Sequence, residues 1–317
     1  MTQAIELPVV LTEVEFERWM GKPEHWLALA NRIADMEGFT PSVMELFGNS
    51  TNLVVNLDDR HILKVFPPMY ESQFSSERNA LRFLKGQLEI AVPSIKSEGN
   101  ANGWHWLITT KLDGIVGSMA WPLLSETAKE SVLEQIGAAI AHMQKLPVDN
   151  LVLQRPSWHD FVRKQLENCF EHHRQLGMAH NFLADLKLII EDAPTIIPLD
   201  LQPVLLTGDW IPQNMFLTER NGKWKLTGVI DFGDVMTGWG EYDLLAPNAF
   251  MCSGEPDRTQ ALLRGYGVPN GICDTAMRRR LLTLALLHAE SDISKIDIDS
   301  WQHRANSLFD LGSISWP

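Results

Sequence analysis

The chain has 317 residues, of which 45% are hydrophobic and 21% charged, so it can form two structural units around a large core. Its formal net charge is -13, and apart from the run 278–280 it has no basic cluster of the kind that a nucleic-acid binder presents. No stretch reaches the roughly 18 apolar residues that span a bilayer, and the N-terminus lacks a secretory pattern. The three scattered cysteines favour reduced thiols. We therefore expect a cytoplasmic protein without a nucleic-acid or membrane partner.

The first third of the chain alternates between short strands and helices. Residues 13–37 carry apolar side chains at helical spacing, and Gly38 is expected to end that helix. A second helix is predicted over 72–86. Strands are predicted where apolar runs lie between turn signals, over 42–47, 53–57, 61–66, 91–97 and 104–110.

The pattern changes after Asp113 and Gly114. Helical stretches dominate 125–192 and 255–291, and a mixed polar and apolar segment, 204–246, lies between them. We therefore predict an α+β fold of two lobes. The predicted units are a helical extension (1–40), an N-lobe with a small antiparallel sheet and one helix (41–113), and a larger, mainly helical C-lobe (114–317).

Segment 204–246 carries the residues with catalytic chemistry. Asp209 follows an apolar run, and Asn214 lies five residues further on. A hairpin with its turn at 219–222 returns to a strand that ends in Asp231, so Asn214 and Asp231 should lie at the same end of the hairpin, close to Asp209. Each residue alone is more typical of a turn. Together they form the hard-oxygen cluster that Mg²⁺ with nucleotide phosphates requires, and one carboxylate remains to orient a hydroxyl nucleophile.

This segment resembles the aminoglycoside phosphotransferase and choline kinase-like family. The family's pattern is His-Gly-Asp, four residues, Asn, and a strand end like Ile-Asp-Phe-Gly-Asp; the chain has Thr-Gly-Asp, Asn214 and Ile-Asp-Phe-Gly-Asp in this order. The resemblance implies a protein kinase-like fold, with Asp209 as the catalytic aspartate and Asn214 and Asp231 as metal ligands. The family's usual histidine is Thr207 here. The residue at this place is expected to shape the backbone around Asp209 rather than to accept the proton.

A kinase-like fold places demands on the N-lobe as well. A lysine on the third strand should neutralise nucleotide phosphates, and a glutamate on the next helix should position it. Lys64 and Glu77 occur in this order. The polar turn that contains Ser50 would cover the phosphates through backbone and hydroxyl groups. By position and resemblance, Thr110 and Leu112 belong to the hinge that binds adenine.

These residues favour transfer of the γ-phosphate of ATP, with GTP as the alternative nucleotide, to a hydroxyl of a small molecule in the presence of Mg²⁺. An aminoglycoside, a choline-like alcohol, an amino acid or a sugar would fit as the acceptor. A second hypothesis, motivated by Thr207, is a nucleotide-binding regulatory protein with little catalysis. A protein acceptor is a third, weakened because the chain lacks the His-Arg-Asp and Ala-Pro-Glu segments of protein kinases. The acidic C-lobe favours an amine-bearing acceptor, for which the candidate carboxylates are Glu255, Asp257, Glu290 and Asp292.

Overall fold

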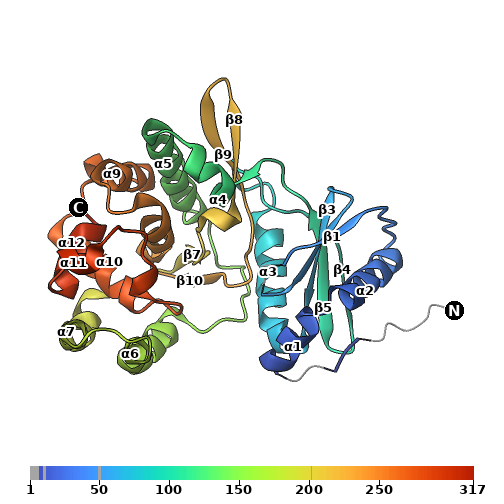
Figure 1. Cartoon of the computed structure of the whole chain (residues 1–317), viewed down its shortest axis with the longest axis horizontal. Helices are drawn as coiled ribbons and strands as arrows, with labels where there is room; N and C mark the ends of the chain where they lie inside the picture. The colour runs from blue at the N-terminus through green and yellow to red at the C-terminus, as the bar shows by residue number, and fades with distance from the viewer. Residues whose placement is uncertain (1–6, 10–11, 49–50, 201) are drawn as a thin grey trace.

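Two lobes make up the part of the chain that the computed structural model describes, namely residues 7–9, 12–48, 51–200 and 202–317 (Figure 1). One lobe is a twisted sheet with helices on both faces, and the other is mainly helical (Figure 1). Within these ranges no helix combines the length and the apolar character needed to cross a membrane.

The N-lobe sheet is antiparallel throughout, with the strand order β1-β2-β3-β5-β4. Its strands are β1 (Met44–Leu46), β2 (Leu53–Leu57), β3 (His61–Phe66), β4 (Ile95–Ala101) and β5 (Trp104–Thr110). Asp58 and Asp59, both at positive φ, form the turn between β2 and β3, since aspartate tolerates this conformation in tight turns. β3 lies in the middle of the sheet, where Lys64 is paired with Val54 and Leu107.

Two N-terminal helices cover one face of this sheet. They are α1 (Glu13–Met20) and α2 (Pro23–Met36), and Trp26 of α2 is completely buried between them and the sheet. Leu63 and Val65 of β3 belong to the same apolar cluster. The residues predicted as a helical extension therefore complete the core of the N-lobe.

The opposite face of the sheet packs against α3 (Glu71–Leu84). Phe66, Phe74 and Leu107 form a small buried cluster there. Because side chains alternate along a strand, Lys64 lies on this face, with Phe66 and away from the cluster under α1 and α2. The alternation of β3 thus aims the lysine toward α3.

Two predicted elements differ from the structure. The helix predicted over 13–37 is two helices in the structure. Pro23 has no N–H to donate, and its ring would clash with the carbonyl four residues earlier, so a helix cannot continue through it. Pro23 is instead the first residue of α2. The strand predicted over 91–97 is β4 in the structure, which begins four residues later, at Ile95. Ala91, at the start of the predicted strand, pairs with Gly228 of the C-lobe and so leaves the N-lobe sheet.

The C-lobe is built from long helices joined by short helical turns. The long helices are α5 (Glu126–Met143), α6 (Trp158–Gln175), α7 (His180–Ile196), α9 (Pro256–Tyr266), α10 (Thr275–Leu286) and α12 (Leu308–Ser315). The shorter helical segments of the chain are η1 (Pro68–Tyr70), α4 (Gly117–Ala120), η2 (Trp121–Leu123), η3 (Pro212–Asn214), η4 (Gly240–Leu244), α8 (Leu245–Pro247), η5 (Asn248–Cys252), η6 (Pro269–Gly271), η7 (Ile293–Lys295) and α11 (Trp301–Arg304). Gly137 and Gly265 let α5 and α9 touch through their backbones, since a Cβ atom on either would overlap the other helix.

Two small sheets position segment 204–246. One pairs β7 (Val204–Leu206) with β10 (Met236–Gly238), and the other has the order β6-β8-β9, with β6 (Ile115–Val116), β8 (Met215–Arg220) and β9 (Lys223–Val229). The predicted hairpin is β8–β9, which projects from the molecule (Figure 1). Its turn residues Asn221 and Gly222 have positive φ, as a tight hairpin turn requires.

Candidate active site

The loop that follows β7 carries Asp209. Gly208 has a φ of 72°, a conformation that costs glycine little, and it turns the chain just before Asp209. The buried carboxylate of Asp243 holds this turn: it accepts hydrogen bonds from the N–H groups of Thr207 (3.2 Å) and Gly208 (2.8 Å) and from the indole N–H of Trp210 (3.2 Å). The loop is therefore anchored from inside the C-lobe.

The hydroxyl of Thr207 belongs to the same anchor. It donates to Asp243 Oδ1 (3.4 Å) and accepts from the backbone N–H of Asp209 (3.4 Å). Burial raises the pKa of Asp243 to about 6, although its N–H partners favour the ionised form. Thr207 thus connects a buried carboxylate to the backbone of Asp209, an arrangement suited to shaping this loop.

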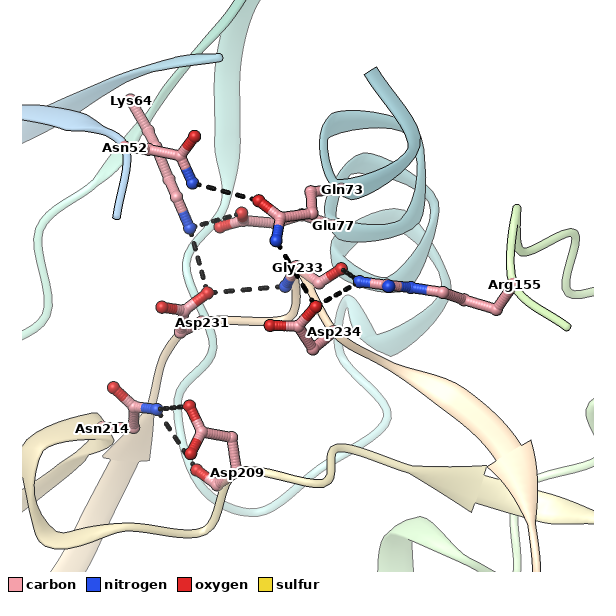
Figure 2. A network of polar contacts seen from close by, with 10 residues as sticks. All are labelled: Asn52, Lys64, Gln73, Glu77, Arg155, Asp209, Asn214, Asp231, Gly233 and Asp234. Carbon is pink, nitrogen blue, oxygen red and sulfur yellow. Dashed lines mark hydrogen bonds and ion pairs between the residues drawn. The ribbon is translucent and has the colours of Figure 1, made fainter. Parts of the chain in front are cut away.

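Asp209 is bound directly to Asn214. The amide nitrogen of Asn214 donates to Asp209 Oδ2 (2.7 Å) and to the backbone carbonyl of Asp209 (3.2 Å), which leaves Oδ1 to accept from another donor (Figure 2). Burial raises the pKa of Asp209 to about 6, and the negative charges of Asp231 and Asp234 act in the same direction. A carboxylate with a pKa close to neutrality is suited to orient a hydroxyl and to accept its proton.

The β8–β9 hairpin brings Asn214 and Asp231 to one end. The N–H of Ile230 donates to the backbone carbonyl of Asn214 (2.9 Å), so the chain before β8 and the chain after β9 stay together. Asp231 has a φ of 66°, which is uncommon outside glycine and typical of special sites. The N–H of Gly233 donates to Asp231 Oδ1 (3.4 Å), which orients the carboxylate (Figure 2).

Lys64 connects the two lobes at this site. Its ammonium nitrogen lies 2.7 Å from Glu77 Oε2 and 2.9 Å from Asp231 Oδ1 (Figure 2). Burial disfavours the ammonium charge, but the facing carboxylates of Asp231 and Glu77 outweigh it, so the pKa of Lys64 lies above its ordinary value. Lys64 in turn lowers the pKa of Asp231, and burial raises that of Glu77. An ammonium group has three N–H donors, so one remains for an anionic ligand.

Asn214 and Asp231 have the chemistry of magnesium ligands. Asn214 uses its nitrogen toward Asp209, so its amide oxygen can face a cation. The carboxylate of Asp231 is 45% exposed and supplies a second oxygen ligand. In the described ranges, no three His, Cys, Asp or Glu side chains form a metal site by themselves. Mg²⁺ bound to nucleotide phosphates takes only one or two protein carboxylates, so this pair would share the cation with phosphate oxygens.

Thr110 and Leu112, two other predicted nucleotide-binding residues, make their contacts outside this cluster. Thr110 ends β5, where its hydroxyl accepts from the N–H of Ser94 (2.9 Å) and its N–H donates to the carbonyl of Ser94 (3.0 Å). Leu112 packs over Gly228, where a Cβ atom would collide with it. Ser50 falls outside the described residues. The hinge role of Thr110 and Leu112 and the phosphate contact of Ser50 stay predictions.

An arginine that the sequence pattern does not single out completes the network. Arg155, between α5 and α6, donates to the carbonyl of Gly233 and to the carboxylate of Asp234 (Figure 2). Gln73 of α3 donates to Asp234 as well (3.5 Å), so this carboxylate is bound from both lobes. Arg155 precedes Gly233 by 78 positions, so no local spacing could have linked the two.

A histidine beyond the end of α10 reaches the Asp209 loop from another side. The His288 ring stacks on Tyr242 with 5.0 Å between centroids and 9° between planes. Its Nδ1 accepts from the N–H of Glu290 (3.1 Å), which places the proton on Nε2, and the backbone of Gly208 lies close enough to the ring to favour its protonated form. Burial lowers the pKa of His288. The sequence offered no signal for this contact.

A cavity of about 270 Å³ lies beside Asp209 in the C-lobe. Of the four carboxylates considered for an amine-bearing acceptor, Glu290 and Asp292 line this cavity. Glu255 and Asp257 lie at the start of α9 and are not among its lining residues. Of the four candidate carboxylates, Glu290 and Asp292 are therefore the two that border the cavity beside Asp209.

Comparisons with known proteins agree with this arrangement. The model of the phosphotransferase enzyme family matches residues 45–281, which include the residues predicted for catalysis, metal binding and nucleotide binding. The structure of wild-type aminoglycoside 2'-phosphotransferase-IIIa with GDP is 16% identical, with a TM-score of 0.69 over 91% of this chain and 96% of that one. The ternary complex of APH(2")-IIa with streptomycin and ATP is 17% identical, with a TM-score of 0.59 over 82% and 89%. APH(3'')-Id from Streptomyces rimosus is 18% identical, with a TM-score of 0.57 over 83% and 98%.

These structures share the protein kinase-like fold with the present chain, so the predicted α+β fold with a small antiparallel sheet in one lobe and a larger helical lobe is confirmed. The family match covers more than half of the chain. It agrees with the resemblance carried by Asp209, Asn214 and Asp231. The chain belongs to the phosphotransferase enzyme family.

Proposed function

We propose that this protein transfers the γ-phosphate of ATP, with GTP as the alternative donor, to a hydroxyl group of a small molecule. The observation that carries the proposal is the meeting of Lys64 and Asp231 at the lobe junction, next to the Asp209–Asn214 pair (Figure 2). Phosphoryl transfer needs a positioned nucleophile and neutralised phosphate charge, and these four residues can supply both. Membership of the phosphotransferase enzyme family supports the same reaction class.

Each residue has a distinct part in this proposal. Asp209 Oδ1 accepts a hydrogen bond from the acceptor hydroxyl, orients its oxygen and takes up its proton. Lys64, positioned by Glu77, offers its remaining N–H and its charge to the nucleotide phosphates. Asn214 and Asp231 would hold Mg²⁺, which neutralises charge on phosphate oxygens when bound.

The first experiment measures thermal unfolding with Mg²⁺ and ATP, GTP or ADP. Nucleotide at about 100 times its dissociation constant should stabilise the wild type by about 2.7 kcal/mol. We expect this shift to need Mg²⁺, to disappear in Asp231→Ala and to persist in Asp209→Asn. Turnover of an identified acceptor should fall at least about a hundred-fold in Asp209→Asn, since that variant loses only the proton acceptor.

The alternative function is that of a regulatory nucleotide-binding protein with weak catalysis. A nucleotide-induced shift without transfer to any acceptor would favour it, and normal turnover by Asp209→Asn would reject the role of that residue. No shift with any nucleotide would reject both functions. The hydrogen bonds of Thr207 to Asp243 and to the backbone of Asp209 support the enzyme, because they anchor the loop without the family's histidine.

We also propose that Glu290 recognises an amine on the acceptor. Within the described residues, its carboxylate has no ion-pair partner, whereas Asp292 lies 3.3 Å from the Lys295 ammonium. The test uses two acceptors that differ only in one amino group. Glu290→Gln should raise KM about ten-fold for the acceptor with the amine and leave KM of the neutral acceptor unchanged. Equal KM ratios in wild type and variant would reject this contact.

A further inference from the structure

The cavity beside Asp209 is mainly apolar. It lies inside the C-lobe, bordered by α10, α12 and the chain that follows η4. Hydrocarbon side chains form most of its wall, among them Leu245, Phe250, Leu282, Ile296, Leu311 and Trp316. Gly208 and Asp209 line the same cavity, so a bound molecule could present a hydroxyl to the Asp209 carboxylate.

Few charges face this cavity. Besides Asp209, the charged residues of its wall are Glu290, Asp292 and Lys295. The Asp292 carboxylate pairs with Lys295 and accepts hydrogen bonds from the N–H (3.1 Å) and the hydroxyl (2.6 Å) of Ser294, so its charge is already compensated. In the described wall, Glu290 remains to match one ammonium group.

One part of the wall combines an exposed aromatic ring with an unusual backbone. Phe250 is 39% exposed and lies in the π-helical turn η5. Such turns are rare and recur at functional sites. Ligand pockets are lined mostly by apolar and aromatic side chains with a few placed polar groups. This wall has that composition, with Asp209 and Glu290 among its few charged groups.

We propose that the acceptor is an alcohol with a largely hydrocarbon body of one or two rings and at most one amine, bound in this cavity with its hydroxyl at Asp209. The inference rests on the proposed phosphotransfer and names its acceptor class. The cavity volume, about 270 Å³, suits a ligand of this size. A polycationic amino sugar does not fit, because each ammonium taken from water needs its own carboxylate.

The proposed step is a simple transfer. The acceptor oxygen forms a bond to the γ-phosphorus, and the bond from that phosphorus to the nucleoside diphosphate oxygen breaks. The hydroxyl proton passes to Asp209, and the nucleoside diphosphate leaves with the electron pair of the broken bond. No oxidant, reductant or further reactant is needed.

Three alanine-to-leucine variants test the site. Ala285 of α10 and Ala249 of η5 line the cavity from two walls, so a leucine at either position would fill part of it. Ala276 also lies in α10 but is exposed and outside the cavity, which makes Ala276→Leu the matched control. The probes are naphthalenemethanol, phenylethanolamine and kanamycin, and their binding is measured by calorimetry without turnover. Binding of ATP with Mg²⁺ is measured in parallel on each variant.

We expect both aromatic alcohols to bind wild type and Ala276→Leu alike and to bind Ala285→Leu and Ala249→Leu about ten-fold more weakly or worse. If one filling variant does not fold, the other decides. Binding of kanamycin in place of the aromatic alcohols would overturn the inference, as would equal binding of these alcohols by all variants. If the protein binds nucleotide but neither aromatic alcohol, the acceptor class is rejected and the phosphotransferase proposal is kept. If the alcohols bind wild type but not the filling variants, and no nucleotide binds, the cavity is confirmed as an alcohol site and the phosphotransferase proposal is rejected.

Discussion

The residue before Asp209 is held from two directions. Asp243 accepts a hydrogen bond from the N–H of Gly208, and the ring of His288 lies near the Gly208 backbone from beyond α10. The family pattern has a histidine at position 207, where this chain has threonine. His288 therefore places an imidazole beside the Asp209 loop through tertiary structure, from a position far away in the sequence.

Replacing His288 by phenylalanine should keep the stack on Tyr242 and remove the polar contacts of the ring with Glu290 and the Gly208 backbone. The Asp209 loop would lose about 1 kcal/mol of the free energy that holds it in position, so kcat should fall roughly five- to ten-fold. The dissociation constant for nucleotide should stay unchanged. Steady-state kinetics together with nucleotide titration check this. An unchanged kcat would show that Asp243 alone positions the loop.

The same ring should make stability depend on pH. Burial lowers the pKa of His288 below its ordinary value of 6.5, so at mildly acid pH the unfolded chain binds a proton that the folded protein does not. The neutral ring thus contributes stability that is present above the unfolded-state pKa and is lost as the pH falls below it toward the folded-state pKa. Thermal unfolding between about pH 7.5 and 5.5 should therefore change less unfavourably in His288→Phe than in wild type. His173, whose pKa burial also lowers, and Asp209 and Asp243, whose raised pKa values act in the opposite direction, contribute to both proteins and cancel in this comparison.

At the scale of elements, α1 and α2 act as part of the N-lobe core. Trp26 is fully buried and its indole N–H donates to the carbonyl of Trp19 (2.7 Å). Trp26→Ala should cost about 3–5 kcal/mol of unfolding free energy, as expected for a large buried aromatic. Val14→Ala on the exposed side of α1 should cost less than about 0.5 kcal/mol. Urea unfolding measures both, and a Trp26→Ala variant as stable as wild type would mean that the two helices are an appendage.

At the scale of the whole molecule, polar contacts join the lobes at the site. Besides Lys64–Asp231, Gln73 donates to Asp234, and Asn79 donates to the carbonyl of Val152 (2.8 Å). Since hinge closure around ligands is common in such two-lobed proteins, these contacts should favour the closed arrangement.

The double variant Gln73→Ala with Asn79→Ala should therefore open the lobes. Each lost hydrogen bond weakens closure by about 1 kcal/mol, so small-angle scattering without nucleotide should give a larger radius of gyration than wild type. Nucleotide with Mg²⁺ should bring the value back. Arg82→Ala, which removes a pair within the N-lobe, is the control and should leave the radius unchanged. An unaltered radius in the double variant would assign closure to the remaining contacts, namely Lys64 with Asp231 and the backbone pairing of Ala91 with the C-lobe.

Local chemistry made much of the site predictable from the sequence. Alternation along β3 sets which face Lys64 occupies, and the spacing of a hairpin places Asn214 near Asp231, because both relations act within a few residues. The family and the two-lobed fold followed from the same motifs. The break at Pro23 was equally local, and the prediction of a single helix missed it.

Contacts between distant elements were decided only by tertiary structure. Arg155 on the Asp234 loop, His288 on the Gly208 backbone and the apolar cavity beside Asp209 each depend on which helices meet. Periodicity shows which side of a helix is buried but not which partner covers it, because apolar packing is non-directional and depends on the area removed from water. The sequence by itself therefore determined the family, the two-lobed fold and which polar residues meet at the lobe junction, and only the packing of the C-lobe determined the apolar cavity beside Asp209.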